Sequence, residues 1–167
     1  MNERRVHEPF VFAAIGIGLT ACFGYAAIVV AALAFRWQLG TWWIALVQAH
    51  GHAQLFGWTG LFVLGVGLFF LPRLRGTTLA WPRLAPWALS SLVGGITLRA
   101  LSQPLLAFSQ PSMPQHPLNE ALGRSGLMLS GALELVSVAL ILTMLAASFR
   151  RARPMTPSAL SSPCCRT

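Results

Sequence analysis

Between Trp42 and Pro72 the chain reads WWIALVQAHGHAQLFGWTGLFVLGVGLFFLP, without a single aspartate, glutamate, lysine or arginine. This stretch is longer than the roughly 20 apolar residues that cross about 30 Å of hydrocarbon as a helix. Its apolar residues leave no continuous polar stripe, and a helix that is apolar on every side suits lipid rather than water. The stretch therefore predicts a membrane-spanning helix, closed by Pro72 and Arg73.

Three further apolar blocks surround this one. The whole sequence is 55% hydrophobic and only 10% charged, whereas soluble domains carry about 25% charged residues. We predict an all-α integral membrane bundle of four transmembrane helices, at about 10–35, 45–71, 86–106 and 126–149, with Pro104 ending the third at the outer surface. Residues 1–149 form this domain, and the polar segment 150–167 is predicted to be a disordered cytoplasmic tail.

The arginines predict how the bundle is oriented. All 12 basic residues are arginines, and they lie between the apolar blocks rather than in one patch, which argues against nucleic-acid binding. Two arginines, Arg36 and Arg124, are predicted to lie on one side of the membrane, and Arg99 falls within the third span. The remaining nine share the other side: Arg4, Arg5, Arg73, Arg75, Arg83, Arg150, Arg151, Arg153 and Arg166. The positive-inside rule then places both termini in the cytoplasm.

The first apolar block also invites comparison with a secretory signal peptide. It follows Arg4 and Arg5 and ends in the small-residue sequence Ala32, Leu33, Ala34. Its apolar run is far longer than the about 7 to 15 residues of a signal peptide core. A retained helix is the expected outcome.

Four ionisable residues lie at membrane depth: His50, His52, Arg99 and Glu134. Such residues normally face the bundle interior, a partner or a cofactor. Residues two apart on a helix are rotated by about 200°, so His50 and His52 cannot ligate one metal from a regular helix. We take His52 as the inward one. A neutral imidazole is a good axial ligand for haem iron, and the alternative is an interfacial histidine bonded to a neighbour.

Arg99 and Glu134 are close in predicted depth. The favoured interpretation is a buried ion pair that fixes the register of the third and fourth helices. The alternative is that Arg99 holds a haem propionate while Glu134 is protonated or relays protons. No CxxCH motif is present, so any haem would be held without a covalent bond.

The run from Gln48 to Gly76 resembles the histidine-bearing helix of the NnrS family and, more distantly, of haem-copper oxidase subunit I. Its elements HGHxxLFGW and LPRxxG carry the likeness, together with LRALSQP at 98–104. The resemblance implies a polytopic bacterial inner-membrane protein with haem b and, secondarily, copper. It also implies nitric oxide response or respiratory redox chemistry, with His52 as haem ligand and His50 as its companion. This chain departs from that family in two features. Phe69 and Phe70 stand just before Leu-Pro-Arg, where related sequences carry a histidine, and the chain has four predicted spans where full members of the family have many more.

These observations lead to one hypothesis and two rivals. The first is a membrane haem-binding protein with His52 as axial ligand and His50 or His116 as second ligand. A complete oxidase would need more histidines than the four in this chain. The rivals are a non-catalytic assembly or structural subunit, which binds other membrane subunits without a cofactor, and a small self-associating transporter, a dimer built around Arg99 and Glu134.

Overall fold

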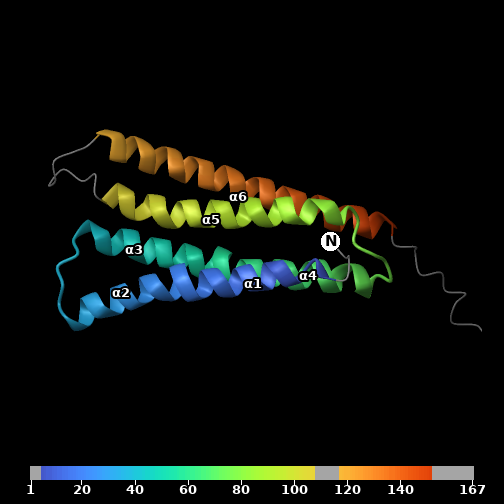
Figure 1. Ribbon diagram of the computed structural model, residues 1–167, viewed down its shortest axis with the longest axis horizontal. Coiled ribbons are helices and arrows are strands. Elements are labelled where there is room, and N and C mark those ends of the chain that lie inside the picture. Colours follow the sequence, from blue (N-terminus) through green and yellow to red (C-terminus); the bar gives the residue numbers. More distant parts are fainter. Residues whose placement is uncertain (1–4, 108–116, 152–167) are drawn as a thin grey trace, which may run out of the picture.

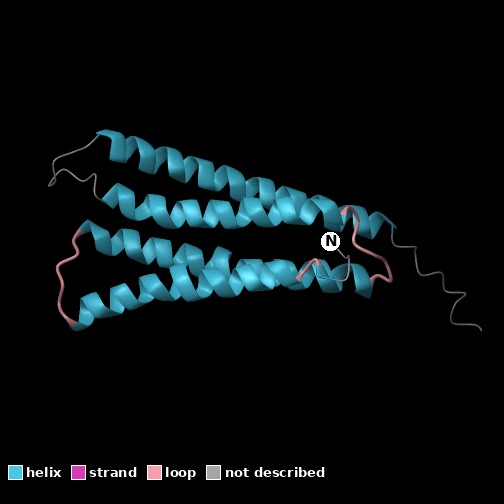
Figure 2. Cartoon of the chain, viewed as in Figure 1, coloured by secondary structure: helices cyan, strands magenta, loops and turns pink. Residues whose placement is uncertain are grey.

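The computed structural model describes residues 5–107 and 117–151, which form four long helices and, within those ranges, no strand (Figure 2). Each of the four is long and apolar enough to cross a membrane, so the predicted all-α bundle of four spans is confirmed. The elements are α1 (Glu8–Ile17), η2 (Gly18–Cys22), α2 (Phe23–Ala34), α3 (Thr41–His52), η3 (Ala53–Gly60), α4 (Leu61–Leu74), η4 (Pro82–Leu84), α5 (Ala85–Ala107) and α6 (Pro117–Arg151).

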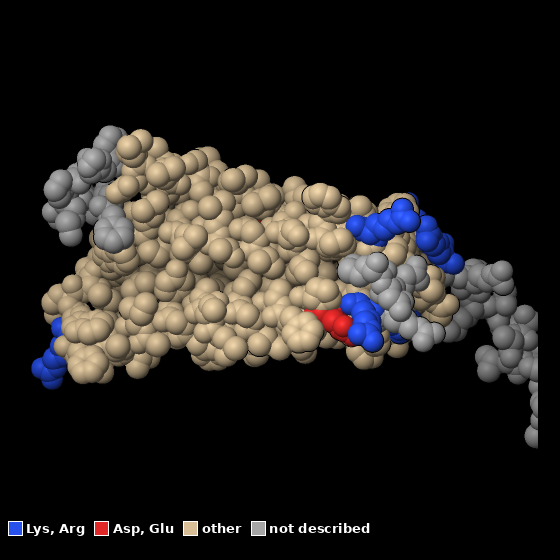
Figure 3. All heavy atoms as spheres, in the orientation of Figure 1, with Lys and Arg blue, Asp and Glu red and all other residues tan. Residues whose placement is uncertain are grey.

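Successive helices run in opposite directions, so α1 begins and α6 ends at the same end of the bundle (Figure 1). α5 and α6 form one antiparallel hairpin. The first helix, made of α1, η2 and α2, and the second, made of α3, η3 and α4, form the other. Basic side chains gather at the end where α1 begins, while the middle of the visible face is uncharged (Figure 3). An even number of spans agrees with the distribution of arginines.

Two prolines do not end helices where the sequence predicted. Pro72 lies inside α4, which continues to Leu74, and Pro104 lies inside α5, which continues to Ala107. Proline removes only its own backbone donor and keeps a helical φ, and continuing the helix satisfies the following backbone groups within lipid. The residue that terminates α4 is Gly76.

Gly76 ends α4 because it adopts a left-handed conformation, with φ of 62°. Its N–H donates to the Arg73 carbonyl at 2.9 Å, and the Thr77 N–H donates to the Pro72 carbonyl at 3.0 Å. This pair of bonds is the Schellman arrangement, which satisfies the last carbonyls of a helix and favours glycine at the left-handed position. The second span therefore continues three residues, nearly one turn, beyond its predicted end at Leu71.

α6 begins at Pro117, well before the predicted start at Gly126, and ends at Arg151. Its first turns are polar: Arg124 Nη2 lies 2.7 Å from Glu120 Oε1, one helical turn away. The apolar block marks only where lipid contact begins, whereas the helix itself starts at a proline, which is favoured in a first turn. Arg150 and Arg151, assigned to the tail by sequence, belong to α6. The rest of that predicted tail, and His116, lie outside the described residues.

Small residues let the helices approach closely, as is common in membranes. A Cβ atom on Gly95 of α5 would lie 2.9 Å from the Ser130 carbonyl oxygen of α6 and 2.9 Å from Glu134 Cγ. In the other hairpin, a Cβ on Gly65 would lie 2.7 Å from Phe10 Cβ. Both hairpins are thus packed backbone against backbone at a glycine.

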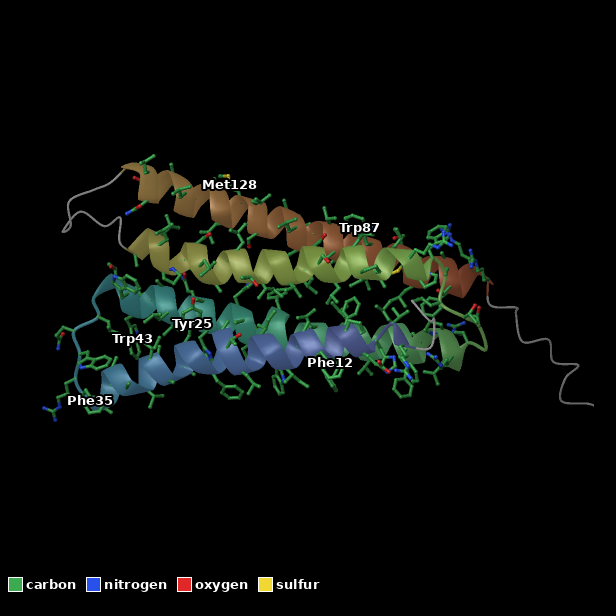
Figure 4. All side chains as sticks on the ribbon, in the orientation of Figure 1. Phe12, Tyr25, Phe35, Trp43, Trp87 and Met128 are labelled. Atoms are coloured by element: carbon green, nitrogen blue, oxygen red, sulfur yellow. The ribbon has the colours of Figure 1, made fainter. Side chains whose placement is uncertain are left out.

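The outer surface consists of large apolar side chains. Phe12 is 71% exposed, Trp87 69% and Met128 78%, and Figure 4 labels all three. In water such a surface would be costly, because apolar area is stabilised by removal from water. In a bilayer it contacts acyl chains, and the surface therefore matches the lipid environment predicted from composition.

The contact at Gly95 generates a stability prediction. Gly95→Ala forces the backbone of α6 away from α5, and we expect the free energy of unfolding in detergent to fall by about 1 to 3 kcal/mol, the usual cost of overpacking. Gly94→Ala is the matched control, because its added Cβ meets only Leu133 Cδ1, at an ordinary 3.9 Å. Equal stability of the two variants would contradict the close α5–α6 contact.

Candidate functional site

His52 and Glu134 form a hydrogen-bonded pair between the second and fourth helices. His52, the last residue of α3, places its Nε2 2.9 Å from Glu134 Oε1 on α6. Ser130 Oγ donates to the same carboxylate oxygen at 3.3 Å. The two side chains are only 12% and 13% exposed. With the carboxylate ionised, the imidazole must carry its proton on Nε2, because a carboxylate only accepts.

The predicted ion pair between Arg99 and Glu134 is wrong. Glu134 bonds to His52, and Arg99 Nε is buried without a hydrogen-bond partner among the described residues. Gly95 of α5 packs closely against Glu134, where an added Cβ would lie 2.9 Å from Glu134 Cγ. Arg99 lies one helical turn beyond Gly95 toward the C-terminal end of α5. The similar predicted depth of Arg99 and Glu134 in their spans was not enough to make them neighbours, because depth does not determine which way a side chain faces.

His50 is held by the first helix rather than the fourth. Its Nδ1 lies 2.9 Å from the Cys22 carbonyl oxygen, and because a carbonyl only accepts, Nδ1 carries the proton. Nε2 then has a lone pair and no partner among residues 5–107 and 117–151. His50 and His52 thus contact different helices, as their two-residue spacing predicts.

Both histidines lie just before a π-helical segment of the second helix, and the first helix has a π-helical segment at the same level. η2 ends at Cys22, η3 begins directly after His52, and the two π-helical segments contact each other. The Cys22 thiol links them by donating to Gln54 Oε1 at 3.0 Å. π-helical segments change the direction of side chains and are frequent at functional sites. The region around His50 and His52 is therefore our candidate site.

Some members of this site were missed by sequence reasoning. Gln54 follows His50 by four residues and Ser130 precedes Glu134 by four, so helical spacing from the known polar residues could have found both. Cys22 comes from another helix, and nothing in its own apolar block signals a bond to His50. The π-helical segments have no sequence signature that we can identify.

The donor atoms decide which residues suit a haem. His50 suits an axial ligand, because an imidazole whose Nδ1–H is held by a carbonyl presents a lone pair on Nε2. His52 suits this role less well, since its Nε2 faces a carboxylate, which leaves Nδ1 for any metal. Within the described ranges no three His, Cys, Asp or Glu side chains come together.

The observed pairing can be tested with a double-mutant cycle. For His52→Ala and Glu134→Ala we expect a coupling of about 0.6 to 1.7 kcal/mol in the free energy of unfolding, between the average and the largest value found for hydrogen bonds between membrane helices. For Arg99→Ala and Glu134→Ala the two effects should add. The measurement is unfolding of the four proteins in each cycle in mixed detergent. Coupling between Arg99 and Glu134 together with none between His52 and Glu134 would contradict the observed pairing and support an ion pair of Arg99 with Glu134.

The chain matches no protein-family model, no curated protein and no solved structure. The likeness of residues 48–76 to the NnrS family therefore stays a prediction. Function has to be argued from the chemistry of the residues buried in the bundle.

Proposed function

We propose that this chain is a bacterial inner-membrane haem-binding protein, which acts in nitric oxide response or respiratory redox chemistry. The observation that carries the proposal is His50: its Nδ1–H is held by the Cys22 carbonyl at 2.9 Å, which leaves Nε2 as a metal ligand. The NnrS-like sequence around it supports the same chemistry. The donor geometry supports His50 ahead of His52, the reverse of the order that the resemblance implies.

Other residues of the chain would have supporting roles. Arg99, whose buried Nε lacks a partner among the described residues, would pair with a haem propionate. Haem b supplies gas binding or one-electron transfer when it is bound. The Cys22 carbonyl would keep the His50 tautomer fixed. The few histidines of the chain support a binding or accessory role rather than a complete oxidase.

We place both termini in the cytoplasm. The described arginines at the end where the helical part starts and finishes are Arg5, Arg73, Arg75, Arg83, Arg150 and Arg151. At the opposite end the described arginines are Arg36 and Arg124. This bias supports a cytoplasmic location for the basic end.

A second candidate function is supported by a different observation. The carboxylate–imidazole pair of Glu134 and His52 lies inside the spans and is largely shielded. Paired ionisable groups at that depth are typical of proton relays in transporters. A dimeric, proton-coupled transporter would use this pair and would need no haem.

Absorption spectroscopy tests the haem proposal. We expect the detergent-purified protein, expressed with ample haem, to give a b-type spectrum that shifts on reduction with dithionite. His50→Ala should lose the spectrum, because no other described imidazole has the same arrangement, whereas His52→Ala should keep most of it. His7→Ala is the matched control, since His7 precedes α1, at the basic end of the bundle. A colourless wild type would overturn the haem proposal.

Orientation is tested separately. A reporter enzyme that is active only in the periplasm should be inactive when fused after Arg151. The same reporter inserted between α2 and α3, within residues 36–40, should be active. The reverse pattern would contradict the cytoplasmic placement of the termini.

A further inference from the structure

A groove follows the last turns of α6, at the end of the bundle where the basic side chains gather (Figure 3). Its volume is about 450 Å³, within the about 300 to 1,000 Å³ of sites that hold small molecules. We call it the arginine groove, and its lining residues are Trp81, Thr143, Ala146, Ala147, Arg150 and Arg151. Those from α6 recur at intervals of three and four, which places them on one face of that helix.

The connection between α4 and η4 supplies the other wall of the arginine groove. Ala80, which is fully buried, donates its backbone N–H to Ser148 Oγ of α6 at 2.8 Å. This bond holds the next residue, Trp81, beside the last turns of α6. Trp81 has a left-handed backbone, with φ of 51° and ψ of 52°, which costs a bulky residue about 1 to 2 kcal/mol. Its side chain is nevertheless 51% exposed, so burial of the indole does not account for this conformation.

The two arginines of the groove have no counter-charge in the part of the chain that the structure describes. Neither Arg150 nor Arg151 makes a hydrogen bond or an ion pair there. The carboxylates within the described ranges are each paired with another side chain: Glu8, Glu120 and Glu134. Guanidinium groups bind phosphate through parallel charge-assisted hydrogen bonds. This end of the groove therefore suits a phosphate group.

The rest of the arginine groove lies at the depth of acyl chains. The apolar block of the fourth span ends at Phe149, directly before the arginines. Thr143 lies about 12 Å further into the membrane than Arg151, at 1.5 Å of rise per residue. Thr143 and Ala146 are exposed on the outer surface of the span, and the Thr143 hydroxyl already donates to the Leu140 carbonyl at 2.8 Å. This part of the groove therefore offers an uncharged surface of small side chains.

We propose that the arginine groove binds one anionic phospholipid. The phosphate contacts Arg150 and Arg151, the indole of Trp81 lies at the level of the glycerol, and an acyl chain follows Ala146 toward Thr143. Basic pockets of membrane proteins hold anionic headgroups in this way, and an indole is favoured at headgroup depth. A soluble phosphate would use only the arginines and would leave the apolar part of the groove empty. This site is independent of the haem proposal, because it shares no residue with the region around His50 and His52.

The test is equilibrium binding to the full chain in a neutral detergent, with bound lipids counted by native mass spectrometry. The probes are dioctanoyl phosphatidylglycerol, dioctanoyl phosphatidylcholine with the same chains and no net charge, and glycerophosphoglycerol, which is the anionic head without chains. We expect the phosphatidylglycerol to bind about 5- to 30-fold more tightly than the phosphatidylcholine, as for about 1 kcal/mol from each arginine. The headgroup alone should bind more weakly than either lipid, and added salt should reduce the preference for the anionic lipid.

Charge variants locate the headgroup. The double variant Arg150→Gln, Arg151→Gln should lose the preference for phosphatidylglycerol over phosphatidylcholine. The double variant Arg5→Gln, Arg73→Gln is the matched control, because it removes the same charge from the same end of the bundle but leaves the lining of the groove intact. An equal loss in the two double variants would show general attraction to the basic end and would overturn the proposal.

A second pair of variants locates the acyl chain. Ala146→Trp should fill the groove and weaken binding of phosphatidylglycerol while both arginines remain. Leu142→Trp is its control, because Leu142 is also exposed on α6, at 59%, but does not line the groove. Equal binding of the two lipids by the wild type, binding of the headgroup alone as tight as that of the lipid, or full binding by Ala146→Trp would each contradict the phospholipid site.

Discussion

Polar groups that this chain carries into lipid must find their partners inside the protein, because hydrocarbon offers neither donors nor acceptors. The interhelical bonds of the bundle follow from that constraint. His50 bonds to the first helix, His52 to the fourth, and Gln48 to the third. All three residues lie within two turns of α3. This short segment therefore touches every other helix of the bundle through a polar contact.

The same constraint explains what the sequence could predict. Spans appear as long apolar runs, because each span must exclude charge over the full thickness of the membrane. The alternation of arginine-rich and arginine-poor connections then agrees with an even number of spans. Helix ends are less visible, because Pro72 and Pro104 are compatible with a helix that continues, and the polar first turns of α6 look like a loop.

The candidate site was predictable only in part. His50, His52 and Glu134 were recognisable because charge within lipid is rare and needs a reason. Their partners were not, because a partner depends on the rotation of each helix about its axis, which apolar spans do not encode. Arg99 illustrates this: its position along the third span paired it with Glu134, whose partner is His52. Gln48 and Gln103, which are polar but uncharged, drew no attention until the structure brought them together.

The π-helical segment η3 sets how the two halves of the second helix are rotated relative to each other. A π-helical segment bonds each residue to the fifth one along instead of the fourth, so its turns hold more residues than α-helical turns. Each residue turns an α-helix by about 100°, so losing one from Ala53–Gly60 would swing α4 away from its present neighbours, with Gly65 leaving Phe10. The histidines before η3 and the glycine contact after it therefore keep their present neighbours together only while η3 keeps its number of residues, and a deletion there would require one half of the helix to repack.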